Sequence, residues 1–180
     1  MYPRCISLFA GIVLAATGAV SGASAAENDK QFFQSVAGSW KGPGEIVAGK
    51  YKGTKFSCNL TGEPQDGGKA GLKLEGTCRV GVFSQPMSAV ISQAGSSYKG
   101  KFLDGATGKG LDVISGAVNG NKVVLGINRA KLNGAMIARL EDDNAMKVTI
   151  SVKVEDRMVP VIGVTLNRQQ VDDMKVGSIE

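Results

Sequence analysis

Short segments in which apolar and polar residues alternate fill most of this 180-residue chain, and they constrain its fold more than any other feature. An alternation with a period of two residues gives a β-strand one apolar face, so these segments predict half-buried antiparallel strands. The pattern predicts about ten strands: Ser39 to Val47, Lys50 to Thr61, Gly71 to Val80, Pro86 to Gln93, Tyr98 to Leu103, Gly110 to Val118, Lys122 to Arg129, Ala135 to Leu140, Met146 to Glu155 and Val159 to Arg168.

Short turn sequences rich in Gly, Asn, Asp and Ser separate these strands. Asn119-Gly120 and Asn133-Gly134 each predict a tight hairpin, because Asn and Gly tolerate the positive φ that such turns need. Connections this short cannot make parallel crossovers, so each strand should pair with its sequence neighbours. Closing such a meander removes its exposed edges. We therefore predict an all-β fold, an antiparallel up-and-down barrel of about 8–10 strands.

The last long strands show most clearly which side chains should line the barrel. In Met146 to Glu155, five apolar side chains alternate with Lys, Thr, Ser and Glu, so they should point inward: Met146, Val148, Ile150, Val152 and Val154. The inward sets of other strands are smaller or mixed, as in Met87, Ala89 and Ile91 and in Met136, Ala138 and Leu140. This mixture predicts a narrow or partly filled interior.

The N-terminal residues 1 to 25 have the features of a secretory signal peptide. Arg4 supplies the positive end, Ile6 to Val20 the apolar run, and Ala23-Ser24-Ala25 the small residues of a cleavage site. We therefore expect a periplasmic or secreted protein with no stable membrane span after cleavage. The remaining chain would comprise an N-terminal arm at 26–38 with a short helix over Glu27 to Ala37, the barrel domain at 39–168 and a C-terminal tail at 169–180.

Export would place Cys58 and Cys78 in an oxidising compartment, where two cysteines of a small domain are usually joined. A hairpin folded about Gly67-Gly68-Lys69 puts Cys58 directly opposite Cys78, which predicts a disulfide between them. The same register pairs Leu60 with Gly76 and puts Phe56 and Leu60 on the cysteine face of the hairpin. A redox-active pair is disfavoured, since the Cys-x-x-Cys spacing is absent.

Several function classes are disfavoured by composition. The chain has no His, which excludes His-ligated zinc, His-ligated haem and imidazole acid–base catalysis. The carboxylates of Glu45, Asp104, Asp112 and Glu141 have no spacing that brings two together, so we predict neither a catalytic site nor a cofactor or metal site. Removing Arg4 with the signal peptide lowers the net charge from +5 to +4, too little to predict nucleic-acid binding.

Gly38-Ser39-Trp40, at the entry to the first strand, resembles the Gly-x-Trp signature of lipocalins and related calycin barrels. This resemblance implies that Trp40 closes one end of the interior and that Arg168, from the last strand, covers it through a cation–π contact. With Cys58, Cys78 and the ending from Val164 to Arg168, the chain is also similar to uncharacterised exported proteins of alphaproteobacteria. That similarity implies a barrel and an exported location but no activity. Haem barrels of the nitrobindin type are also ten-stranded, but their haem ligand is a His.

Three functional hypotheses follow, none of them enzymatic. The leading one is an exported barrel that binds a small apolar or amphipathic ligand, or a cell-envelope partner at its rim. Its candidate interior lining is Phe56, Leu60, Val148, Ile150 and Val152. A resemblance to periplasmic inhibitors of serralysin-type metalloproteases implies an alternative, an inhibitor that acts through Phe32 and Phe33 of its N-terminal arm. A structural envelope protein is the third hypothesis, and no oligomeric state is predicted.

Overall fold

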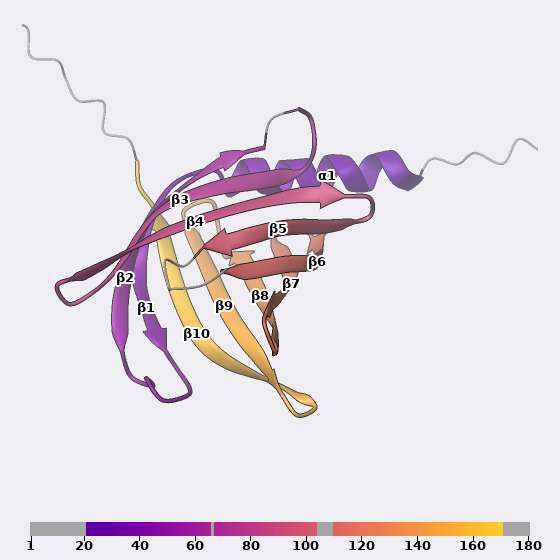
Figure 1. Cartoon of the computed structure of the whole chain (residues 1–180). Coiled ribbons are helices and arrows are strands. Elements are labelled where there is room, and N and C mark those ends of the chain that lie inside the picture. The colour runs from indigo at the N-terminus through magenta and orange to yellow at the C-terminus, as the bar shows by residue number, and fades with distance from the viewer. Residues whose placement is uncertain (1–20, 66, 104–109, 171–180) are drawn as a thin grey trace, which may run out of the picture.

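A computed structural model describes residues 21–65, 67–103 and 110–170, which form one helix and ten strands (Figure 1). The helix and strands are α1 (Ser21–Ser35), β1 (Gly38–Ile46), β2 (Lys55–Pro64), β3 (Gly71–Val80), β4 (Phe83–Ala94), β5 (Ser97–Leu103), β6 (Leu111–Asn119), β7 (Lys122–Arg129), β8 (Leu132–Leu140), β9 (Ala145–Val154) and β10 (Arg157–Arg168). The predicted barrel domain at 39–168 therefore nearly coincides with the strands. Residues 1–20 of the predicted signal peptide and residues 171–180 of the predicted tail lie outside the described residues, whereas residues 21–25 of the predicted signal peptide belong to α1.

The strands form a closed barrel in which each strand pairs antiparallel with its neighbours in sequence. Pairing of β1 with β10, for example Trp40 with Arg168, closes the barrel. The predicted all-β, up-and-down barrel is confirmed. The β2–β3 register is also as predicted, with Cys58 opposite Cys78 and Leu60 opposite Gly76.

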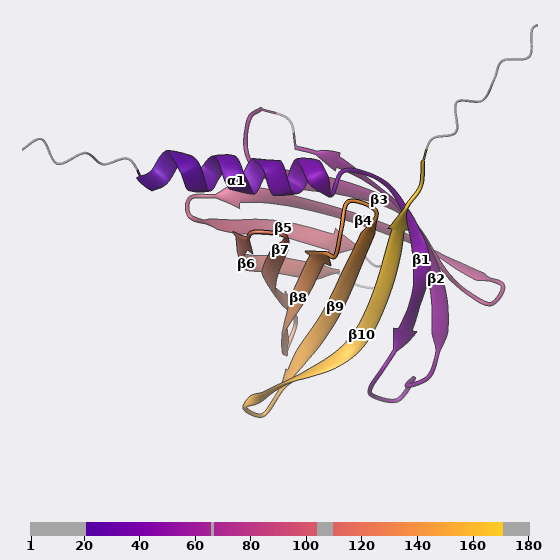
Figure 2. The same ribbon diagram turned by 180° about the vertical axis from the view of Figure 1, so that it is seen from behind.

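The two ends of this barrel differ. The closed end carries α1, which lies across it in Figures 1 and 2, and the β2–β3, β4–β5, β6–β7 and β8–β9 turns. The open end carries the β1–β2, β3–β4, β7–β8 and β9–β10 turns. Alternating turns of a meander lie at opposite ends, so this division follows from the topology alone. The described residues include no helix with the length and hydrophobicity to span a membrane.

One of the two predicted Asn-Gly turns is wrong. Asn119-Gly120 is at the β6–β7 reversal as expected, but Asn133 and Gly134 lie inside β8, opposite Asn128 and Ile127 of β7. The chain reverses earlier, at 130–131, where Ala130 has a φ of 52°. Gly134 serves close strand packing instead, because a Cβ there would lie 2.3 Å from the backbone oxygen of Ser151.

The N-terminal helix is longer than predicted and begins earlier. The sequence predicts a helix over Glu27 to Ala37, whereas α1 spans Ser21–Ser35. The Ala-rich stretch before Glu27 has high helix propensity, so nothing local ends the helix there. One face of the last turns is buried, with Phe32, Phe33 and Val36 in the hydrophobic core at the closed end.

Candidate functional site: an apolar cavity with one open end

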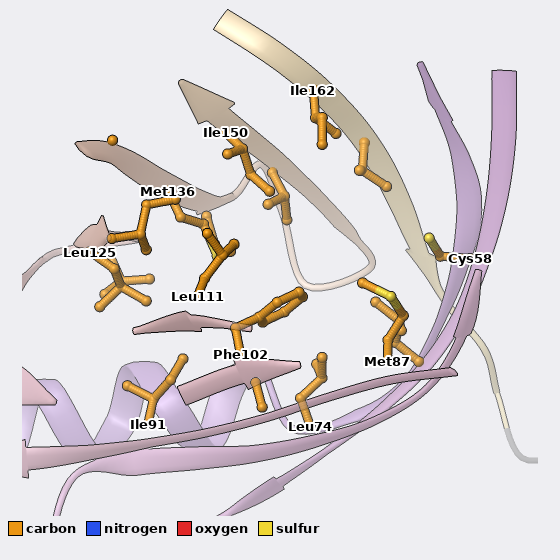
Figure 3. A pocket seen from close by; sticks show the side chains of 18 of the residues that line it. Cys58, Leu74, Met87, Ile91, Phe102, Leu111, Leu125, Met136, Ile150 and Ile162 are labelled. Atoms are coloured by element: carbon orange, nitrogen blue, oxygen red, sulfur yellow. The ribbon is translucent and has the colours of Figure 1, made fainter. Parts of the chain in front are cut away.

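The barrel encloses a cavity of about 500 Å³. Its lining comes from α1 and from most strands, and Figure 3 shows side chains from opposite walls pointing into a common space. The labelled residues there have only carbon and sulfur side-chain atoms: Cys58, Leu74, Met87, Ile91, Phe102, Leu111, Leu125, Met136, Ile150 and Ile162. The cavity extends from Phe32, Phe33 and Val36 at the closed end to Leu132 and Asn133 beside the β7–β8 turn.

All five residues proposed as interior lining do line this cavity. Phe56 and Leu60 come from β2, and Val148, Ile150 and Val152 come from β9. Val154, which the alternation of β9 also predicted to point inside, is 51% exposed and lies next to the β9–β10 turn. The inward positions from Met146 to Val152 line the cavity. Val154 does not, because it lies at the end of β9, where the strand extends past the cavity.

Other lining residues were not singled out from the sequence, although the same alternation marks several of them. Along β7, buried side chains occur at every second position, and β8 supplies two more from its inward face. The residues of β7 that were not singled out are Val123, Leu125 and Ile127. Met136 and Ala138 of β8 belong to the inward set expected from the sequence, and both line the cavity. A strict reading of period two in each strand would have found the β7 residues as well.

A glycine on β1 makes room for an aromatic ring in the wall. Gly44 pairs with Phe56 of β2, and a Cβ on Gly44 would lie 2.4 Å from two ring atoms of Phe56. The ring therefore occupies the place of the missing side chain. Any side chain at position 44 would displace the Phe56 ring. Gly44 therefore fixes the position of a ring that lines the cavity.

In the part of the chain that the structure describes, polar side chains occur in the lining only at the open end of the cavity. Among the described lining residues, Arg129 and Asn133 are the two with polar side-chain groups, and they flank the β7–β8 turn. Arg129 Nε donates to the carbonyl oxygen of Gly110 at 3.0 Å, and Asn133 Oδ1 accepts from Asn128 Nδ2 at 2.8 Å. The lining is thus apolar at depth and polar only near the mouth, a distribution that suits an amphipathic molecule.

At the closed end, Trp40 and Arg168 lie as the calycin resemblance implies. Trp40 is 1% exposed, and its Nε1 donates to Val36 O at 2.9 Å. The Arg168 Cζ lies 4.3 Å from the centre of the Trp40 ring. The guanidinium also donates to three carbonyl oxygens, those of Ser35 and Ala37 at 2.6 Å each and that of Asp143 at 2.8 Å. Arg168 therefore fastens the end of α1 and the β8–β9 turn to the last strand.

The two Phe residues proposed as contacts of a free arm are packed against the barrel. Phe32 and Phe33 are buried, and the Phe33 ring lies 5.3 Å from that of Tyr98. The hydroxyl of Tyr98 donates to Asp29 Oδ2 of α1 at 2.5 Å, and burial together with this hydrogen bond raises the pKa of Tyr98. Insertion of this arm into a protease would require α1 to leave the barrel and expose both rings.

The predicted disulfide joins Cys58 and Cys78 with a Cα–Cα distance of 4.0 Å. Both residues line the cavity, so the bridge lies in the barrel wall. A disulfide is typical of an oxidising, non-cytoplasmic setting. Within the residues that the structure describes, no group of three or more His, Cys, Asp or Glu side chains is placed to hold a metal ion.

Comparisons with known proteins bear on the fold. No family model matches the chain, and no curated protein matches it. Among solved structures, the chain is similar to that of Rv2717c from M. tuberculosis, with a TM-score of 0.57 and 16% sequence identity. The similarity covers 79% of this chain and 98% of that one. At this identity, it shows a shared barrel fold and nothing about function.

Proposed function

We propose that this protein is a non-catalytic, exported β-barrel that binds a small apolar or amphipathic molecule in its interior. The observation that carries the proposal is the cavity of about 500 Å³, apolar at depth and closed at one end. Ligand sites in proteins typically measure about 300–1,000 Å³ and are lined mostly by apolar side chains with a few placed polar groups. Two such groups, Arg129 and Asn133, are near the mouth.

The chemistry of the lining selects the kind of ligand. Each methylene group that leaves water for an apolar site contributes about 0.8 kcal/mol, whereas an unpaired buried polar group costs on the order of 2 kcal/mol or more. A ligand with an aliphatic or aromatic body therefore fits the depth of the cavity. A polar head would stay at the mouth, beside Arg129 and Asn133 and in contact with water.

The proposed location rests on two independent features. Residues 1 to 25 have the composition of a signal peptide. The Cys58–Cys78 disulfide adds the second, since such bridges persist outside reducing compartments. In the periplasm or outside the cell, a binding barrel would keep an apolar molecule away from water.

A first experiment asks what the native protein holds. The protein is purified without denaturation from the compartment that contains it, measured by native mass spectrometry, and extracted to identify any bound molecule. A discrete added mass that belongs to an apolar or amphipathic molecule is expected. A clean mass of the protein alone, with no binding of an added apolar probe, would contradict the proposal and favour a protein partner or a structural role.

A second experiment locates the binding in the cavity. Titration with the apolar fluorescent probe N-phenyl-1-naphthylamine should give saturable binding. Ile150→Trp fills part of the cavity and should weaken this binding at least tenfold, because the added ring occupies ligand volume. Lys147→Trp, on the outward face of the same strand, is the matched control and should bind as the parent does. Equal binding by both variants would place the probe elsewhere.

A further inference from the structure

The exposed apolar side chains of this barrel gather at its open end. Among the described residues, the exposed large hydrophobic side chains lie in or beside the four turns of that end, except Val90, Leu103 and Ile114. The set is spread over four hairpins and includes Tyr51, Val82, Phe83, Leu132, Val154 and Met158. Single exposed apolar side chains are ordinary, so it is their concentration at one end of the barrel, on several separate tips, that needs an explanation.

The β3–β4 hairpin presents the most exposed of these groups. Val80 and Phe83 pair across its two-residue turn, and Val82 lies in the turn itself. Val82 is 92% exposed and Phe83 is 78% exposed, so neither contributes much to the core. Figure 1 shows this hairpin projecting beyond the neighbouring strands. Tight turns usually carry Gly, Pro or polar residues, so a valine in this turn is unusual.

The charges at the same end are mostly positive. In and beside the described turns of the open end, the exposed basic residues are Lys50, Lys52, Arg79, Lys131, Lys153 and Arg157, against the acidic Glu155 and Asp156. Lys50 Nζ lies 5.5 Å from the centre of the Tyr51 ring, so charged and apolar groups are interleaved there. The acidic run Glu141-Asp142-Asp143 is at the closed end, in the β8–β9 turn.

We propose that the open end docks on the surface of an anionic lipid bilayer. Basic side chains would contact lipid phosphates while Val82 and Phe83 enter the apolar layer. A bilayer suits separate hairpin tips better than a protein does, since lipids conform to a surface that is not continuous. Leu132 belongs both to this exposed set and to the cavity lining, so one of the exposed apolar groups lies at the mouth. Passage of a ligand between bilayer and cavity rests on the proposed function, but the docking itself does not.

Sedimentation with lipid vesicles tests the docking. The intact chain without its signal peptide should bind vesicles of phosphatidylglycerol and phosphatidylcholine, and bind pure phosphatidylcholine more weakly. The double variant Val82→Ser with Phe83→Ser should bind at least tenfold more weakly, because it removes the groups that would enter the apolar layer. Val90→Ser removes an exposed apolar group from the barrel wall and is the matched control. Its binding should equal that of the parent.

A second pair of variants tests the charge. Lys50→Gln with Lys52→Gln should weaken binding to the anionic vesicles about tenfold or more, since each basic group near such a surface contributes on the order of 1 kcal/mol. Lys122→Gln, at the closed end, should change it little. Raising the salt concentration to 1 M, where the Debye length falls to about 3 Å, should remove most of the preference for anionic lipid.

Fluorescence reports which part of the protein enters the bilayer. Phe83→Trp places an indole at the tip, and its emission should shift to the blue and be quenched by brominated lipids. Trp40 is buried at the closed end and should not respond. The docking proposal is overturned by a parent protein that does not bind anionic vesicles, by a tip variant that binds as the parent does, or by an indole at position 83 that stays in water.

Binding of N-phenyl-1-naphthylamine without vesicles separates this proposal from the proposed function. The tip and lysine variants leave the cavity intact and should bind the probe as the parent does. If the parent binds vesicles but not the probe, the docking stands and the cavity function fails. If it binds the probe but not vesicles, the cavity function stands and the docking is wrong.

Discussion

The two ends of the barrel use the same ten strands in opposite ways. At the closed end, the aromatic side chains of Phe33, Trp40 and Tyr98 are buried, and the polar groups beside them have partners. At the open end, the side chains of Val82 and Phe83 are exposed to solvent. The difference arises from one added element, the helix α1, which covers one end and has no counterpart among the described residues of the other. Side chains at the closed end are thus covered by α1, whereas several apolar side chains at the open end remain exposed.

Trp40 should have the largest effect of any single side chain on this contrast. Replacing it by Ala removes a fully buried ring, its hydrogen bond to Val36 and the surface that Arg168 covers. Loss of a buried aromatic side chain costs about 3–5 kcal/mol. The free energy of unfolding, measured in urea, should fall by that amount. Tyr51→Ala at the open end is the matched control, with an expected change within about 0.5 kcal/mol. If both variants lose a similar free energy of unfolding, the two ends do not differ in their contribution to stability.

The disulfide should have the next largest effect. It closes a loop with a sequence separation of 20 residues, and the chain-entropy model assigns such a loop on the order of 3 kcal/mol. The double variant Cys58→Ala with Cys78→Ala should therefore unfold at a lower urea concentration. Both cysteines lie in the cavity wall, so binding of the apolar probe at a temperature where the variant stays folded should change little. If the variant unfolds at the same urea concentration as the parent, strand pairing stabilises this part of the barrel without the disulfide.

A pH titration examines the closed end through Tyr98. Its environment raises the pKa above the ordinary value of 10.0, so the stabilisation is fully present below pH 10 and is lost as the pH rises above it. The free energy of unfolding should therefore decline as the pH rises above 10. Tyr98→Phe should remove this part of the decline. If the parent and the variant lose stability in parallel, the phenol is not held in its neutral form by α1.

Much of this fold could be predicted from sequence because strand alternation and turn residues act locally. The ten strands, their order and the Cys58–Cys78 register follow from such local signals. Prediction failed at Asn133-Gly134, where packing of β8 against Ser151 uses the glycine and the turn falls earlier. It also failed at Val154, since no local signal states where a strand passes beyond the barrel.

The candidate site was predictable in part. Alternation in β9 identified Val148, Ile150 and Val152, and the Gly-x-Trp resemblance identified Trp40 with Arg168. The contact of Tyr98 with Asp29 could not have been found, since 69 residues separate them and only the folded barrel brings them together. The gathering of exposed apolar tips at one end likewise depends on the topology. Each tip by itself resembles an ordinary exposed residue.

The smallest expected effect concerns the open end, and there a null result is informative. Val82→Ser with Phe83→Ser removes two apolar side chains, yet both are exposed and give up little contact area on truncation. The free energy of unfolding should change by no more than about 0.5 kcal/mol. A loss of several kcal/mol would show that the tip packs against the barrel and belongs to its core. If stability is unchanged and vesicle binding is weakened, Val82 and Phe83 serve binding to the bilayer and not folding. The open end would then differ from the closed end in function as well as in exposure.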